Sequence, residues 1–141
     1  MLASKARRTL LLHTYDLEAR IFDRLPFIDA VSALVRRHPG TCFGVLIQNV
    51  ERVVKDGHRL VELARRLGSR VQIRRCAQQY QGYYGTFLLA DDSGYLYRPQ
   101  SSRYEGLASF NNTAEVARLG KYFREVWERS AADVELRRLY V

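Results

Sequence analysis

The side chains with the most evident chemistry lie at the ends of apolar segments. His13 follows the first apolar run, and Tyr84 and Asp91 flank the apolar run at 86–90. In an α/β sheet, active sites gather where strands end. His13 is therefore a candidate catalytic residue, an imidazole for hydrolysis of a small substrate. Asp91 fits the role of a turn residue, because a hairpin-turn sequence follows it.

A polar loop over residues 78–85 combines tyrosines and glutamines with glycine, and Arg98 and Arg103 follow it in the sequence. Aromatic side chains interleaved with arginines stack on bases and neutralise backbone phosphates. Tyrosines in a polar loop are equally suited to a protein interface. The loop therefore predicts binding of a nucleic acid or of a protein.

The chain has 141 residues and a net charge of +8, and its only lysines are Lys5, Lys55 and Lys121. The excess charge therefore comes from arginine, whose planar fork matches phosphates and carboxylates. The charge is spread along the chain, so a second interpretation is that arginine-rich helix faces are simply solvated. A polyanionic partner stays open at this point.

The two cysteines, Cys42 and Cys76, lie in or beside apolar stretches and predict reduced core residues. Neither belongs to a CxxC pair or has a histidine at metal-ligand spacing, so we expect no metal site. No apolar run approaches the roughly 18 residues of a membrane span. We therefore expect a cytoplasmic protein without a membrane partner.

Alternation of apolar and turn residues predicts one α/β domain over residues 1–141, with 131–141 as a tail packed on it. Pro26 stands at the start of one expected helix, Asp56 is the expected N-cap of the next, and Thr113 caps the last. Expected strands cover 9–13, 41–48, 71–73, 86–90, 95–97 and 106–110. The order of elements indicates a mainly parallel mixed sheet flanked by helices on both faces.

Three stretches resemble one repeat of the phospholipase D superfamily. Segment 42–47 resembles its second strand, 85–94 the strand with the His-x-Lys-x-x-x-x-Asp signature, and 115–130 the closing helix. The resemblance implies a phospholipase D-like fold. In that family the histidine is the nucleophile and the lysine holds phosphate oxygens. Counted back from the matching aspartate, these positions fall on Tyr84 and Thr86.

These replacements predict that the family chemistry is lost. A phenol with an ordinary pKa of about 10 is a poor nucleophile at neutral pH, and threonine brings no positive charge. We therefore expect a non-catalytic module for protein interaction or for binding phosphate or nucleic acid through Tyr84, Thr86, Arg98 and Arg103. The alternative is a phosphodiesterase or other hydrolase with a rearranged active site, for which the resemblance implies Tyr84 and Asp91, together with His13, as the candidate catalytic residues. Because single-repeat relatives pair two copies, the resemblance also implies a homodimer.

The chain is also similar to an uncharacterised bacterial domain that occurs alone or fused to an acetyltransferase of the GNAT family. The matching stretches are 56–60, 64–67 and 87–92. This resemblance implies an acetyltransferase-type partner and brings no catalytic residue. A GNAT enzyme itself is a rival by size, but its pyrophosphate-loop pattern over 79–84 ends in a bulky tyrosine and precedes a strand. No cofactor is expected.

Overall fold

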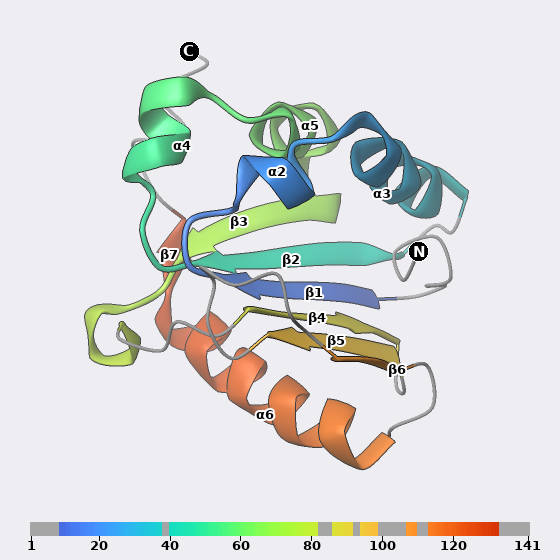
Figure 1. Cartoon of the computed structure of the whole chain (residues 1–141), viewed down its shortest axis with the longest axis vertical. Helices are drawn as coiled ribbons and strands as arrows, with labels where there is room; N and C mark the ends of the chain where they lie inside the picture. Colours follow the sequence, from blue (N-terminus) through green and yellow to red (C-terminus); the bar gives the residue numbers. More distant parts are fainter. Residues whose placement is uncertain are drawn as a thin grey trace.

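The computed structural model describes residues 9–37, 40–81, 86–91, 94–98, 107–109 and 113–132. These residues form a seven-stranded sheet in the order β6-β5-β4-β1-β2-β3-β7 (Figure 1). The strands are β1 (Thr9–Thr14), β2 (Cys42–Ile47), β3 (Val71–Arg75), β4 (Thr86–Ala90), β5 (Gly94–Arg98), β6 (Leu107–Ser109) and β7 (Ala131–Ala132).

The sheet is mixed, and the expectation of a mainly parallel sheet is wrong. Only β1, β2 and β3 run parallel, through the pairs β1–β2 and β2–β3. The pairs β1–β4, β4–β5, β5–β6 and β3–β7 are antiparallel. Helices connect the three parallel strands, as crossover connections require, whereas the connection from β4 to β5 is only residues 91–93 long and can only produce an antiparallel pair.

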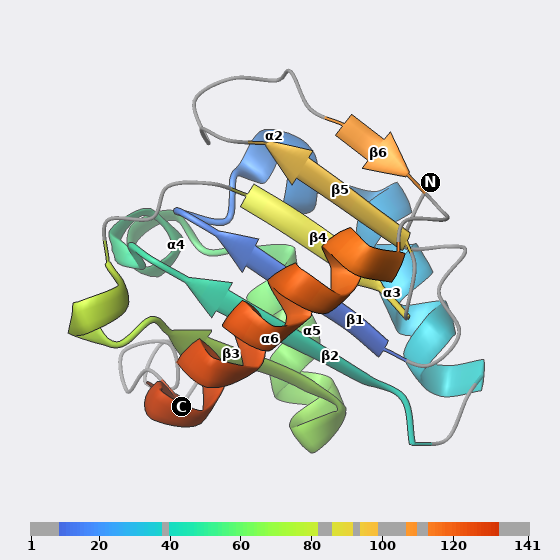
Figure 2. The same ribbon diagram turned by 90° about the horizontal axis from the view of Figure 1, so that it is seen from below.

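Helices cover both faces of the sheet, as the sequence predicts. On one face lie α2 (Ala19–Phe22), α3 (Leu25–Arg37) and α5 (Arg59–Leu67), with α4 (Glu51–Asp56) beyond the carboxyl end of β2 (Figure 1). Short 3-10 turns, η1 (Gly68–Arg70) and η2 (Gln78–Tyr80), flank β3. Helix α6 (Thr113–Arg129) crosses the opposite face, which Figure 2 shows from below.

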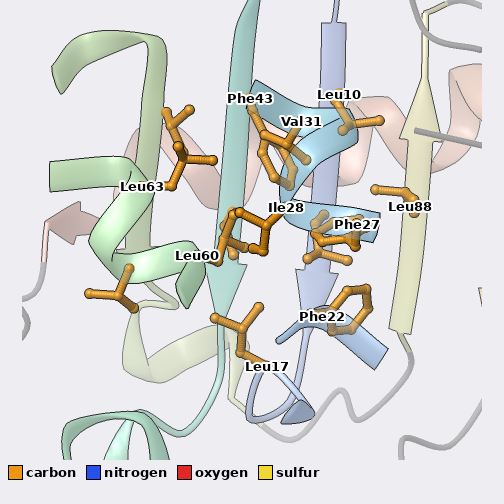
Figure 3. Packing of buried hydrophobic residues seen from close by; sticks show 14 of the residues in the cluster. Leu10, Leu17, Phe22, Phe27, Ile28, Val31, Phe43, Leu60, Leu63 and Leu88 are labelled. Carbon is orange, nitrogen blue, oxygen red and sulfur yellow. The ribbon is translucent and has the colours of Figure 1, made fainter. Parts of the chain in front are cut away.

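Two apolar clusters hold these layers together. The larger one joins α2, α3 and α5 to the sheet, and Figure 3 shows Phe27, Phe43 and Leu60 among its members. The smaller one joins α6 to the other face through Leu46, Phe87 and Phe123. Side chains of successive strand residues point to opposite faces. The apolar run of β2 therefore supplies both clusters, which explains why it does not alternate with polar residues.

Some expected boundaries are confirmed and others are wrong. Strand β4 matches its expected range. Helix α5 ends at Leu67, and its C-cap Gly68 has a positive φ of 61°. Asp56 is not the N-cap of α5, because it ends α4. His58 has that role, and its Nδ1 accepts a hydrogen bond from the Leu60 amide at 3.0 Å. Thr113 is the first residue of α6.

The short strand β7 was not predicted from the sequence, and it pairs with Arg74 and Arg75 of β3. Residues 133–141, most of the expected tail, lie outside the described residues. Cys76 is buried, but the expectation of a buried Cys42 is wrong because this residue is exposed at the start of β2. No described helix is long and apolar enough to span a membrane.

Candidate functional site

At the carboxyl edge of the parallel strands, His13 is enclosed by other side chains and has no exposed surface. Its ring stacks on Phe87 with centroids 5.0 Å apart and meets the edge of Tyr122 at 6.0 Å. The Gln48 side-chain nitrogen lies 3.2 Å from Nε2 of His13 and also donates to the Tyr80 carbonyl at 3.2 Å. An amide nitrogen donates and does not accept, so Nε2 of His13 is the acceptor. This imidazole is part of a packed aromatic cluster.

The other expected ligand-binding residues are only partly described. Thr86 opens β4 and is 2% exposed, so its hydroxyl does not face solvent. Tyr84 and Arg103 lie outside the described residues, and Arg98 ends β5 with a side chain that is not described. The roles assigned to these four residues therefore stay predictions.

Arg74, close to the expected loop, has a structural role. Its guanidinium donates to the Trp127 carbonyl at 2.7 Å and lies 4.2 Å from the centre of the indole ring. A hydrogen bond from the Ala77 amide to the Ser130 hydroxyl at 2.9 Å fixes the same region. These contacts join the end of α6 to β3, and they occupy the Arg74 side chain.

Asp91 lies at the opposite end of the sheet from Thr86. It follows β4 with a positive φ of 55°, which is unusual for a residue other than glycine. One of its carboxylate oxygens accepts a hydrogen bond from the Thr9 amide at 3.1 Å, and its own amide donates to the Thr9 carbonyl at 3.0 Å. Since His13 pairs with Phe87, four residues separate His13 from Asp91 along the strand, about 13 Å. The structure does not bring these two catalytic candidates together.

A cavity of about 570 Å³ lies at the amino ends of β1 and β2, between the sheet and α6. Its size is typical of sites for small molecules. Its walls are mainly apolar, with polar side chains at the margins. The lining residues are Thr9, Leu11, Cys42, Phe43, Gly44, Gln72, Leu89, Asp91, Thr113, Val116, Ala117, Gly120, Phe123, Arg124 and Trp127.

Two glycines inside regular elements line this cavity. A Cβ atom on Gly44 of β2 would lie 3.4 Å from the Trp127 indole and 3.6 Å from Leu11. A Cβ atom on Gly120 of α6 would meet only the Arg124 guanidinium, at 3.5–3.8 Å. Neither residue was among the site residues predicted from the sequence, although a glycine within a strand or helix pattern is a signal of close approach or of a functional role.

The arginines at the ends of α3 and α5 form a second feature, which we call the arginine edge. Both helices lie on the same face of the sheet and are followed by parallel strands, so both end at the edge where β2 and β3 begin (Figure 1). The acidic side chains of these helices, Asp29 and Glu62, lie nearer to their amino ends. The members of the arginine edge are Arg36, Arg37, Arg65, Arg66 and Arg70.

The described residues contain no group of three or more histidine, cysteine, aspartate or glutamate side chains that could hold a metal ion.

The sequence profile of a family described as "Domain of unknown function (DUF7931)" matches residues 1–139. No sequence among the curated proteins matches the chain.

Seven chains of solved structures match the fold. One is TrmBL2, described as an archaeal chromatin protein with a novel mode of DNA binding; the TM-score is 0.62 and the sequence identity 17%. The match covers 94% of this chain but only 44% of TrmBL2. At that identity the similarity concerns the fold.

Proposed function

We propose that this chain, which belongs to the DUF7931 family, is a non-catalytic module of phospholipase D-like type that binds nucleic acid. The arginine edge is the observation that carries the proposal. Arginine forks bind phosphate oxygens in two places at once, and a row of them at one edge suits a chain of phosphates. The net charge of +8 attracts such a polyanion from a distance.

The charge distribution supports the choice of this edge. Basic residues in the last turn stabilise a helix through its dipole, and α3 and α5 each have two. The arginine edge has more positive charge than helix stabilisation requires, because Arg70 of η1 adds to these two pairs. The acidic residues of both helices lie nearer to their amino ends. The fold similarity to TrmBL2, whose structure is described as showing DNA binding, makes nucleic acid the first polyanion to test.

The packing of His13 supports a non-catalytic role. A nucleophile or general base must reach the substrate, and this imidazole has no exposed surface. The hydrolase with a rearranged active site needs His13 and Asp91 at one place, and they lie about 13 Å apart along β4. A homodimer and an acetyltransferase-type partner are separate predictions from the family resemblances.

The test measures the anisotropy of fluorescein-labelled single- and double-stranded DNA at salt concentrations between about 50 and 200 mM. Salt is varied because each contact to a phosphate releases counterions, which makes the affinity depend on the salt concentration. Binding should weaken with salt, and the slope of log K against log salt should fall by about 0.9 for each phosphate contact removed. The double variant Arg36→Gln with Arg37→Gln should therefore reduce the slope. Lys121→Gln with Arg129→Gln removes the same charge from exposed positions of α6 and should leave the slope nearly unchanged.

Two results would overturn the proposal. The first is an affinity for DNA that does not depend on salt, or no affinity at all. The second is an equal loss in both double variants, which would assign binding to net charge and not to the arginine edge. Turnover of a chromogenic phosphodiester by the purified protein, reduced by Tyr84→Phe, would favour the hydrolase.

A further inference from the structure

We propose that the cavity between α6 and the sheet binds a small organic anion with an apolar body, such as a medium-chain carboxylate. This site is separate from the arginine edge, because α6 and the pair α3 and α5 cover opposite faces of the sheet (Figures 1 and 2). The cavity measures about 570 Å³, enough for a small organic molecule.

The empty space is maintained at a cost to the fold. Glycine in the middle of a helix is destabilising by roughly 0.5–1 kcal/mol relative to alanine. At Gly120 no neighbour requires it, because a Cβ atom would make only ordinary contacts with a flexible guanidinium. Gly44 has a packing reason, since the Trp127 indole lies against it. A helix residue that weakens the fold while widening a cavity is expected where the space itself is used.

The walls of the cavity match an apolar body. Leu11 and Leu89 rise from β1 and β4, and Phe123 and Trp127 face them from α6. The rings of Phe123 and Trp127 are nearly parallel, with an interplanar angle of 18° and centroids 5.6 Å apart. A ligand chain lying along these side chains would lose contact with water, which is the main favourable term for an apolar ligand.

The charge at the cavity wall determines the class of ligand. The Arg124 guanidinium lies over Gly120 at this wall, and it has no ion pair with any residue in the described part of the chain. Asp91 is the acidic residue among those that line the cavity. Its carboxylate accepts from the Thr9 amide. An anionic head group therefore belongs at Arg124, with the apolar body extending from it.

The test uses Trp127, which is the only tryptophan of the chain and lines the cavity. Octanoate is titrated into the full chain, with octanamide as a neutral probe of the same length. Octanoate should change the tryptophan fluorescence in a saturable way and bind more tightly than octanamide. It should also slow the reaction of a thiol reagent with Cys42, which is exposed and lines the same cavity.

Three variants separate a specific site from general adsorption. Arg124→Gln should weaken octanoate binding by about tenfold, the usual effect of losing a hydrogen bond to a charged group, and leave octanamide nearly unaffected. Lys121→Gln removes a neighbouring exposed charge that does not line the cavity and should change neither ligand. Gly120→Leu should abolish binding of both ligands by filling the space. Circular dichroism melting confirms that each variant is folded.

The proposal is overturned if octanoate and octanamide bind equally, or if Arg124→Gln and Lys121→Gln weaken octanoate to the same extent. It is also overturned if neither ligand changes the fluorescence of Trp127. If the unmodified chain binds octanoate but does not bind DNA, the proposed function is contradicted and the proposal of this cavity as a ligand site is unaffected.

Discussion

Gly120 offers the sharpest test of how α6 is built, because replacing it with alanine should stabilise the protein. The residue lies in the middle of a helix of 17 residues and is buried. Alanine is preferred over glycine in a helix interior by roughly 0.5–1 kcal/mol. The new methyl group would also fill part of the cavity, which adds favourable burial.

The structure indicates that this gain is not lost to steric clash. The nearest atom to the new Cβ is a guanidinium nitrogen of Arg124 at 3.5 Å, an ordinary contact with the far end of a flexible side chain. We therefore expect Gly120→Ala to raise the free energy of unfolding by about 1 kcal/mol. With a urea m-value of about 2 kcal/mol/M, the midpoint should rise by roughly 0.5 M. The melting temperature should rise by roughly 3 °C.

Gly68→Ala is the matched control, because the chemical change is identical and the expected sign is opposite. A Cβ atom at Gly68 meets nothing within 4 Å, but its φ of 61° is a conformation that alanine disfavours. This variant should lose about 1 kcal/mol. Urea unfolding followed by Trp127 fluorescence measures both. If the urea midpoint of Gly120→Ala is lower than that of the unmodified protein, close packing requires the glycine, and the explanation that Gly120 keeps the cavity open is refuted.

Three further outcomes follow from the buried polar groups. Burial lowers the pKa of the His58 imidazole in the folded protein, and the Asp23 carboxylate partly opposes this effect. As the pH falls through 6.5, the ordinary pKa of histidine, His58 therefore takes up a proton in the unfolded chain before it does so in the folded protein. Stability should therefore decrease from pH 7.5 to pH 5.5, and His58→Asn should reduce that decrease because asparagine caps α5 without titrating. Burial raises the pKa of Cys76 to about 12, so Ellman's reagent at pH 8 should label one thiol, Cys42, rapidly and the second only in urea; two rapid equivalents would contradict the packing. His13→Ala should lower stability by about 2–4 kcal/mol through the cavity it leaves, while the salt dependence of DNA binding should persist at temperatures where the variant is folded. A variant of full stability that no longer binds DNA would give His13 a binding role.

The helical and strand segments could be predicted from the sequence because their apolar residues recur at the right period. Strand β4 and the apolar side of α6 are examples, and Val116, Leu119 and Phe123 are buried as that period requires. The N-cap of α5 was missed because aspartate is the stronger capping residue in isolation. The short helix α4 ends at Asp56, so the next available acceptor is the ring nitrogen of His58.

The candidate site was harder to predict, because it depends on residues from strands whose neighbours are distant in the sequence. Asp91 was singled out beside Tyr84 and Thr86, but the strand between them places Asp91 at the other end of the sheet. There it lies beside Thr9, 82 positions away in the chain. No local pattern could show that Gly44 and Gly120 face the same space, because only the crossing of α6 over β2 brings them together.

The sequence by itself determined the fold class of this protein, an α/β domain with helices on both faces of the sheet. The period of the apolar residues and the turn residues are local properties, so they specify helices and strands without knowledge of tertiary contacts. Only the tertiary structure decided which polar groups are buried in the packing and where an opening is left. His13 became part of an aromatic cluster because Phe87 and Tyr122 pack against it. The cavity formed at the opposite edge because α6 crosses the sheet there and brings its Gly120 and Arg124 to the same space as Gly44 of β2. That crossing depends on how the whole chain packs.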